Sequence, residues 1–248
     1  MEKKELLREP IRDMHIQKGM KVSDLVNEMS NIGGFSAQHL ADGVDILKRM
    51  IDDKNSFNFL SFPADLVSTG LRGLLANAVK YFDAIVTTGG TLDHDIARAN
   101  GGIYHKGTFN VDDSMLHKLG IYREGNVFIE HEQYGLKMEQ AFNRIMQDIY
   151  NSKDYKEEYS ASELIYEFGK RISDEGSIVR QAYLNDVPIF CPGILDGAFG
   201  TALAIFAQDH KFRLNLIKDE LALSNIAFDN KITGALMLGG GISKHHVI

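Results

Sequence analysis

Cysteine, proline and excess positive charge are all scarce in this sequence of 248 residues. Cys191 is the single cysteine, so no internal disulfide can form and nothing indicates a secreted, oxidised protein. No stretch approaches the ~18 apolar residues of a membrane-spanning helix, and the N-terminal MEKKELLREPIRD is charged where a signal peptide is apolar. Lys and Arg number 27 against 34 Asp and Glu, and this net charge of −7 gives no overall attraction for nucleic acid. We therefore expect a soluble, cytoplasmic protein that binds neither membranes nor nucleic acid.

The composition is otherwise that of an ordinary globular chain. Apolar residues make up 44% and charged residues 25%, which excludes a mostly disordered protein. With only 4 prolines, no rigid linker is expected. Apolar residues recur at helical spacing in 22–30 and 37–51, on either side of the turn signal NIGGF. We therefore predict a single α/β domain, in which a helical extension over 1–55 packs on a core over 56–248.

From about residue 56, short β-rich runs alternate with helical patterns. The first two units are FNFLSF (57–62) before a helical 64–82, and AIVTT (84–88) before a helix that begins near Leu92. Later strands are expected at VPIFCP (187–192), RLNLI (213–217) and ALMLGGG (235–241), and at NVFIE (126–130) in an otherwise helical middle. A capping box at Ser160 and Glu163 predicts another helix start. Continuous apolar runs followed by helices predict a Rossmann-like parallel sheet with helices on both faces.

Small and polar residues follow four of these predicted strands. They are Pro63-Ala64-Asp65, Thr87-Thr88-Gly89-Gly90, the run from Pro192 to Gly197, and Gly239-Gly240-Gly241. Ligands of parallel sheets bind at the carboxyl ends of the strands, where helix N-termini offer free N–H groups and glycine lets the backbone approach a phosphate. No loop matches the dinucleotide fingerprint or the P-loop motif. Taken together, the four loops favour a nucleotide or dinucleotide site.

Histidines and carboxylates adjoin these loops. Asp93-His94-Asp95 follow the second strand, Asp196 lies in the third loop, and His245 follows the last. A histidine there suits a general base near neutral pH, and carboxylates suit ribose hydroxyls or an amine substrate. An alternative is a metal-dependent hydrolase that uses His94, Asp95, Asp196 and His245. Because consecutive residues at a helix start point in different directions, we predict no metal site.

Six segments together resemble deoxyhypusine synthase, and they run in the order of that family. They are FLSFPADLVSTGLRG (59–73), DAIVTTGGTLDHDIAR (83–98), GNVFIEHEQYG (125–135), VPIFCPGILDGAFGT (187–201), FRLNLIKDE (212–220) and MLGGGISKHH (237–246). The resemblance implies an NAD-dependent aminobutyl transferase built as a homotetramer. Such enzymes oxidise spermidine with NAD, capture the butyl-imine on an enzyme lysine, pass it to one lysine of the translation initiation factor 5A precursor, and reduce it.

The resemblance also implies roles for individual residues. It gives NAD contacts at Ala64, Asp65, Leu66, Val67, Ser68, Thr88, Gly89, Gly90, His94 and Asp196. It gives polyamine contacts at Asp93, His94, Gly240 and His245, with His245 as the candidate base for the dehydrogenation. NAD would be the hydride acceptor, while the protein supplies orientation, a base and an imine-forming amine.

The sequence departs from the family pattern at two positions and at its end. Asp93-His94 stands where some members have adjacent glutamates, and Thr201 stands where the better-known members have an acidic residue. Fewer carboxylates around a polycationic amine leave a homospermidine-type synthase open. The family continues beyond the KHH motif to a Trp-Gly-Lys with the imine-forming lysine, so we expect that segment to be missing from this sequence, and Lys244 does not match that lysine. A catalytically incomplete NAD-binding paralogue is therefore a further alternative.

Overall fold

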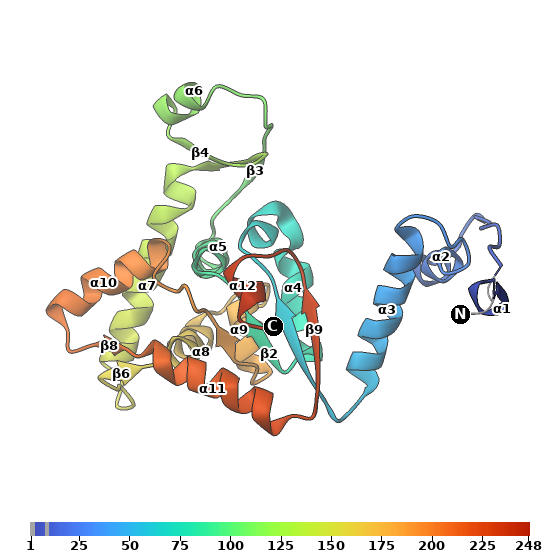
Figure 1. Cartoon of the computed structure of the whole chain (residues 1–248). Coiled ribbons are helices and arrows are strands. Elements are labelled where there is room, and N and C mark those ends of the chain that lie inside the picture. Colours follow the sequence, from blue (N-terminus) through green and yellow to red (C-terminus); the bar gives the residue numbers. More distant parts are fainter. Residues whose placement is uncertain (1–2, 8–9) are drawn as a thin grey trace. The chain divides into compact units, whose positions relative to one another are not determined.

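The computed structural model describes residues 3–7 and 10–248, and the chain divides into two compact units, Met1–Asn55 and Ser56–Ile248 (Figure 1). The described part of the first unit contains helices α1 (Lys3–Leu6), α2 (Val22–Met29) and α3 (Ala37–Asp52). The predicted helices over 22–30 and 37–51 are confirmed as α2 and α3, and glycines of the NIGGF turn separate them. That these helices pack on the main body stays a prediction.

A parallel sheet forms the centre of the second unit. Its strands are β1 (Ser56–Ser61), β2 (Ala84–Val86), β7 (Ile189–Phe190) and β9 (Ile232–Met237), in the spatial order β7-β2-β1-β9. All three strand pairings are parallel. The predicted α/β class is therefore confirmed. In this order the chain runs outward from β1 to β2 and β7, then returns to the other side of β1 as β9, so the direction of winding reverses between β1 and β9.

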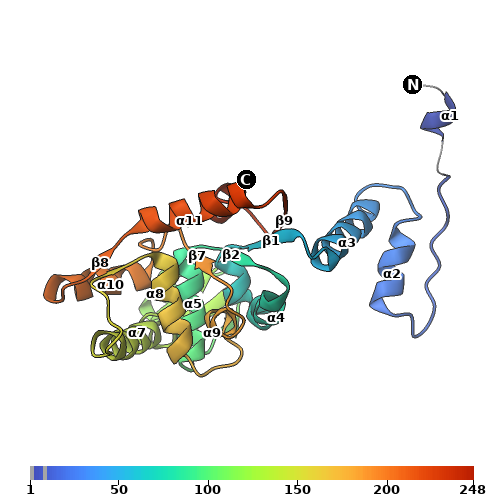
Figure 2. The same ribbon diagram turned by 90° about the horizontal axis from the view of Figure 1, so that it is seen from below.

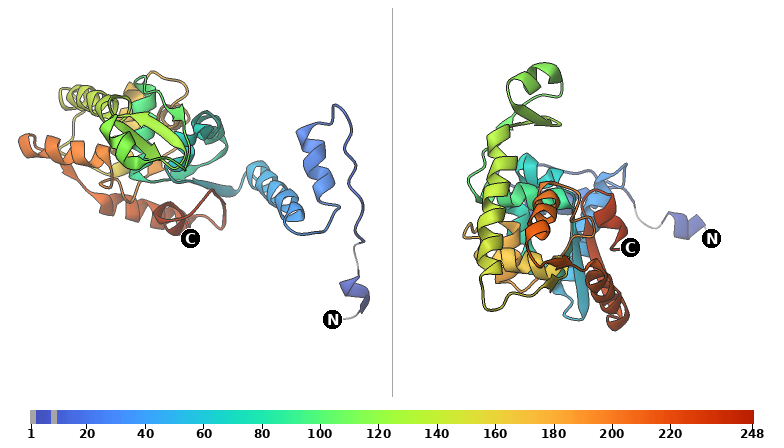
Figure 3. Two further views of the ribbon diagram at one scale, coloured as in Figure 1. Left: turned by 90° about the horizontal axis from the view of Figure 1, so that it is seen from above. Right: turned by 90° about the vertical axis from the view of Figure 1, so that its left-hand side faces the viewer.

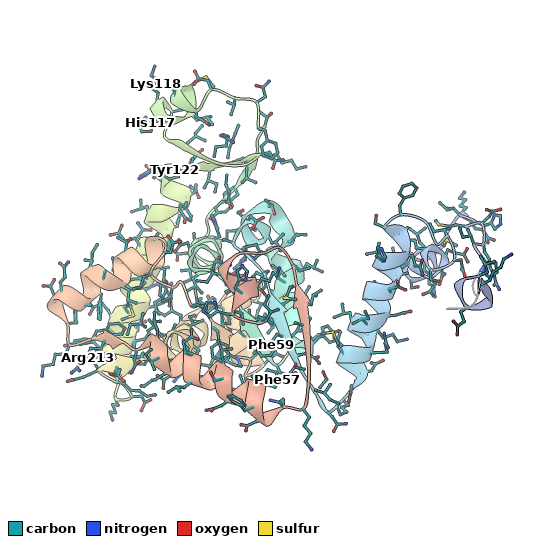
Figure 4. The ribbon with its side chains drawn as sticks, viewed as in Figure 1. Phe57, Phe59, His117, Lys118, Tyr122 and Arg213 are labelled. Carbon is teal, nitrogen blue, oxygen red and sulfur yellow. The ribbon has the colours of Figure 1, made fainter. Side chains whose placement is uncertain are left out.

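Helices cover both faces of this sheet, which explains why its strands read as continuous apolar runs. One face carries α11 (Leu216–Asp229), whose Leu223 and Ile226 pack with Phe59 on β1. Phe57 and Phe59, two residues apart on β1, point to this same face (Figure 4). Figure 2 shows α11 on one side of the sheet, and on the other side α4 (Arg72–Ala78), α5 (Gly89–Ala99), α8 (Ala161–Arg171) and α9 (Ile178–Leu184).

A smaller sheet stands apart from the main one. The hairpin lobe, residues 103–133, comprises β3 (His105–Lys106), α6 (Asp113–Lys118), β4 (Ile121–Glu124), β5 (Val127–Glu130) and the short turn of helix η3 (His131–Gln133). Its strands are antiparallel in the order β3-β5-β4. Figure 3 shows the lobe extending from the body of the unit, beyond the end of α7 (Gly135–Tyr150). The predicted strand at NVFIE is confirmed as β5, whereas β3 and β4 were not predicted.

The remaining elements connect these layers. They are η1 (Val67–Leu71), η2 (Val79–Tyr81), β6 (Glu158–Tyr159), α10 (Ala198–Asp209), β8 (Arg213–Leu214) and α12 (Ile242–His245). The capping box is confirmed at the start of α8, where the Ser160 hydroxyl accepts from the Glu163 N–H and the Glu163 carboxylate accepts from the Ser160 N–H. No helix in the described part of the chain is long and apolar enough to span a membrane.

Two predicted boundaries are wrong. Helix α5 begins at Gly89 rather than near Leu92, because Thr88 is extended and the two glycines already adopt the helical conformation. The RLNLI segment is not a strand of the main sheet. Only Arg213 and Leu214 form a strand, which pairs with β6 in a separate two-stranded sheet. The Asn215 N–H still donates to the Tyr159 carbonyl, and the strand ends there because α11 begins at Leu216.

Candidate functional site

The loops that follow β1, β2, β7 and β9 meet at the carboxyl edge of the main sheet. Glycine is the reason they approach so closely. A Cβ atom on Gly90 would lie 2.9 Å from the Ala64 Cβ atom, and one on Gly239 would lie 3.0 Å from Pro63. A Cβ atom on Gly89 would lie 3.0 Å from the Gly193 carbonyl oxygen. The sequence prediction that these four loops share one edge is therefore correct in geometry.

The edge lies at the point where the winding of the sheet reverses, between β1 and β9. Open α/β sheets bind ligands at this point, because the loops on either side leave a crevice there. The Ser61 carbonyl at the end of β1 accepts from the Leu238 N–H, so the two strands stay paired to the end of β1. The loops that follow them contain Pro63 and Gly239 and approach each other closely.

Thr88 offers an unpaired group at this edge. It immediately precedes α5, and its Oγ1 atom is buried without a hydrogen-bond partner in the part of the chain that the structure describes. A buried hydroxyl without a partner is uncommon and calls for a ligand or a water molecule. The free N–H groups at the start of α5 lie beside it, and such a helix start favours an anion such as a phosphate.

Asp93, on the first turns of α5, holds the start of α10. Its Oδ1 accepts from the Phe199 N–H at 2.7 Å, and its Oδ2 accepts from the Ala198 N–H at 2.9 Å and from the Tyr134 hydroxyl at 3.0 Å. Burial raises the pKa of Asp93, although these hydrogen bonds favour the ionised form. Asp93 was predicted to contact a polyamine. That role stays a prediction, and in this arrangement the carboxylate orients α10.

His94 points in another direction, toward the hairpin lobe. Its Nδ1 lies 2.8 Å from the Tyr104 hydroxyl, and its Nε2 lies 3.2 Å from Glu124 Oε2. The imidazole also stacks on the Tyr134 ring, with 4.9 Å between the ring centroids. Burial raises the pKa of Tyr104, so its hydroxyl stays protonated and can donate to Nδ1 or accept from it, depending on the tautomer of His94.

Asp95 points in a third direction, into the core. It is fully buried and accepts from Arg72 Nε at 2.5 Å, from the Ser177 hydroxyl and from the N–H groups of Ile178 and Val179. Arg72 also binds Asp174 at 2.8 Å. The prediction that the three consecutive side chains 93–95 spread apart is thus correct. Among the described residues no group of three or more His, Cys, Asp or Glu side chains is placed to hold a metal ion. This applies also to His94, Asp95, Asp196 and His245, the residues of the hydrolase alternative.

The other predicted site residues differ in exposure. Asp65, Asp196, Gly240 and His245 are exposed, whereas Val67, Ser68 and Gly89 are buried. His245 belongs to α12, which begins beside the loop after β7. A Cβ atom on Gly193 of that loop would lie 3.5 Å from Cδ1 of Ile242, the first residue of α12. The neighbouring His246 is instead paired with Glu220, at 3.3 Å.

Sequence reasoning missed three residues of this region. Tyr104, Glu124 and Tyr134 surround His94, and they come from a part of the chain without clear periodicity. None of them follows a predicted strand of the main sheet. No spacing signal in the sequence links them to position 94, because their approach depends on how the hairpin lobe folds back toward α5.

Acidification should destabilise the protein through His94. Burial lowers the pKa of His94 from 6.5 to about 4, helped by Arg98 and opposed by Asp93. Between these pH values the unfolded chain binds the proton and the folded chain does not, so stability falls as the pH drops through this window. The full shift corresponds to roughly 3 kcal/mol.

The measurement is urea unfolding above pH 6.5 and near pH 4, for the wild type and for His94→Gln. On acidification the free energy of unfolding of the variant should fall by roughly 3 kcal/mol less than that of the wild type. An equal loss in both proteins would contradict a buried, neutral His94.

Comparisons with known proteins agree on one family. The deoxyhypusine synthase family model matches residues 24–248. The chain is 47% identical to the probable deoxyhypusine synthase of Picrophilus torridus and 48% identical to that of Sulfurisphaera tokodaii, in each case over 100% of this chain and 79% of the relative. A crystal structure from Entamoeba histolytica, of a protein assigned to the same family, aligns with a TM-score of 0.65 at 23% identity, over 93% of this chain and 79% of that one. At that identity the likeness shows the fold alone.

Proposed function

Because the chain belongs to the deoxyhypusine synthase family, we propose that it transfers an aminobutyl group from spermidine to a lysine of the translation initiation factor 5A precursor, with NAD as cofactor. This is the chemistry of hypusine synthesis, and the chain is a transferase of that type. The observation that carries the proposal is the meeting of four strand-end loops where the winding of the sheet reverses, beside the unpaired Thr88 hydroxyl.

The residues at this edge fit a dinucleotide. Gly89 and Gly90 let the loops after β1 and β7 pack directly against the start of α5, and that helix start provides N–H groups for a phosphate. The proposed NAD contacts are residues 64–68 on the first loop, residues 88–90 on the second, His94, and Asp196 on the third. The exposed Asp196 carboxylate suits a ribose hydroxyl, as acidic residues do in other dinucleotide sites.

The proposed amine site lies beside these contacts and comprises Asp93, His94, Gly240 and His245. NAD, when bound, accepts the hydride that leaves the carbon next to the amine nitrogen. The exposed His245 imidazole is the proposed base, which takes the proton from that nitrogen. His94 is neutral near neutral pH, so it adds no positive charge next to a cationic substrate. Its ring and the Tyr134 ring beside it offer apolar faces.

The partners are part of the same proposal. We expect a homo-oligomer, most simply a tetramer, which acts in the cytoplasm on the factor 5A precursor. Spermidine as the amine is also a proposal. Position 201 carries a threonine where the better-known family members have a carboxylate, and its hydroxyl, on the first turn of α10, donates to the Gly197 carbonyl at 3.0 Å.

Amine-dependent formation of NADH tests the proposed function. Purified protein is mixed with NAD and spermidine, and NADH is followed by its absorbance. A parallel reaction contains putrescine in place of spermidine, which tests whether the protein oxidises a different amine. NADH formation that requires spermidine is the expected result. A folded protein that binds NAD but forms no NADH with either amine would favour the alternative of an NAD-binding paralogue.

A further inference from the structure

Glu124 brings a carboxylate of the hairpin lobe to the first loop and α5. It is the last residue of β4, and its Oε2 lies 3.2 Å from His94 Nε2. On the other side it faces the first loop, where a hydrogen bond with the Ser68 side chain lowers its pKa and the nearby Asp65 carboxylate raises it. Both of these are proposed NAD contacts. Nothing in the family resemblance or in the motifs of the sequence marks position 124.

One oxygen of the Glu124 carboxylate is unsatisfied. Its Oε2 is buried and has no hydrogen-bond partner among the described residues, since the contact with His94 Nε2 is not aligned as a hydrogen bond. His94 is neutral, and in the described part of the chain no lysine or arginine lies within ion-pair distance of Glu124. A buried carboxylate oxygen without a donor is costly. A ligand that brings an N–H group and a positive charge would remove that cost.

The surroundings of Glu124 suit a cation. The rings of Tyr104 and Tyr134 flank His94 on the same side of α5, and both tyrosines are near enough to Glu124 for its charge to affect their hydroxyls. Aromatic rings and carboxylates together are the usual partners of an ammonium group. Burial raises the pKa of Glu124, and Asp65 acts in the same direction, so a bound cation would stabilise both ionised carboxylates. The Glu124 side chain as a whole is 33% exposed, although its Oε2 atom is buried.

We propose that Glu124 binds a terminal ammonium group of the amine substrate and is a specificity-determining residue of the site. The hairpin lobe then forms one wall of the amine site. This inference rests on the proposed function, because it needs a polycationic amine as the substrate.

The test is a calorimetric titration of spermidine into the full chain saturated with NADH, so that no turnover takes place. Glu124→Gln keeps the size of the side chain and removes its charge. Glu130→Gln, at an exposed position of the adjacent strand β5, is the matched control. Loss of a charge-assisted hydrogen bond should weaken spermidine binding about tenfold or more in Glu124→Gln and leave the control unchanged. Wild-type affinity in Glu124→Gln would overturn the proposal.

Two acetylated spermidines make the test specific for a direct contact. Each carries an acetyl group on one terminal nitrogen and so lacks the ammonium at that end. For the isomer that lacks the ammonium bound by Glu124, the wild type and Glu124→Gln should bind equally. If Glu124→Gln weakens spermidine and both isomers to the same degree, Glu124 does not contact either end.

The same experiment separates this inference from the proposed function. Wild-type protein that binds NADH but no spermidine would overturn both. Wild-type protein that binds spermidine, with Glu124→Gln unchanged, would overturn only the inference. Urea unfolding reports whether Glu124→Gln is folded. If it is not, Glu124→Asp keeps the charge on a shorter side chain, and it should bind spermidine more weakly than the wild type but more tightly than Glu124→Ala. Equal affinities in these two variants would contradict the proposal.

Discussion

Replacing Gly89 with alanine will weaken NAD binding by roughly 100-fold, because each of the two proposed hydrogen bonds at Thr88 and Asp196 contributes about 1–1.5 kcal/mol and both would be lost. The new Cβ atom would lie 3.0 Å from the Gly193 carbonyl oxygen and closer still to that of Asp196. Both obstacles are backbone atoms, so they cannot rotate away. The loop after β7 would have to move from the start of α5, and the proposed contacts at Thr88 and Asp196 would separate.

The control for this substitution is Gly73→Ala. Gly73 is exposed on α4, has no atom within 4 Å of its potential Cβ atom, and lies in a regular helix. Alanine there should leave NAD affinity unchanged and raise stability by about 0.4–1 kcal/mol. Calorimetric titration with NAD measures both variants. Wild-type NAD affinity in Gly89→Ala would show that the close approach of these loops does not form the cofactor site.

Asp95→Ala will lower the free energy of unfolding by about 3–5 kcal/mol, because it removes one partner of a buried ion pair. Arg72, at 8% exposed, would lose its nearest counter-charge. The N–H groups of Ile178 and Val179 at the start of α9 would also lose their acceptor. Both losses occur inside the layer of helices beneath the sheet, where water cannot replace the carboxylate.

Urea unfolding of Asp95→Ala is compared with that of Asp113→Ala. Asp113 pairs with Arg123 on the surface of the hairpin lobe, at 2.6 Å. Surface ion pairs contribute little, so Asp113→Ala should unfold close to the wild type. If the two variants lose equal stability, the buried network around Asp95 does not hold α4, α5 and α9 together.

The sequence was most informative where a pattern is local. The helices at 22–30 and 37–51 and the capping box at Ser160 were predictable because each depends on neighbours within a few residues, and the strands of the parallel sheet were predictable from their continuous apolar runs. The short strands β3 and β6 were not predicted, and neither was the pairing of β8 with β6, because two residues show no periodicity and pairing depends on distant partners.

In the candidate site, too, the sequence predicted local geometry but not long-range contacts. That residues 93–95 spread apart followed from helix geometry. Their partners did not: Asp93 binds a helix start more than 100 residues away in sequence, and Asp95 binds Arg72 and the start of α9. Because position 94 is a histidine where some family members have a glutamate, the amine site was expected to contain one carboxylate fewer. In the folded chain Glu124 lies beside that position, which no motif could have indicated because it comes from a separate sheet.

Calorimetric titration of NAD into the full chain tests the central claim most directly, namely that the carboxyl edge of the β7-β2-β1-β9 sheet is a cofactor site. We predict saturable binding of one NAD per chain, strongly weakened by Gly89→Ala and unaffected by Gly73→Ala. A folded wild-type protein that shows no saturable NAD binding would contradict the account.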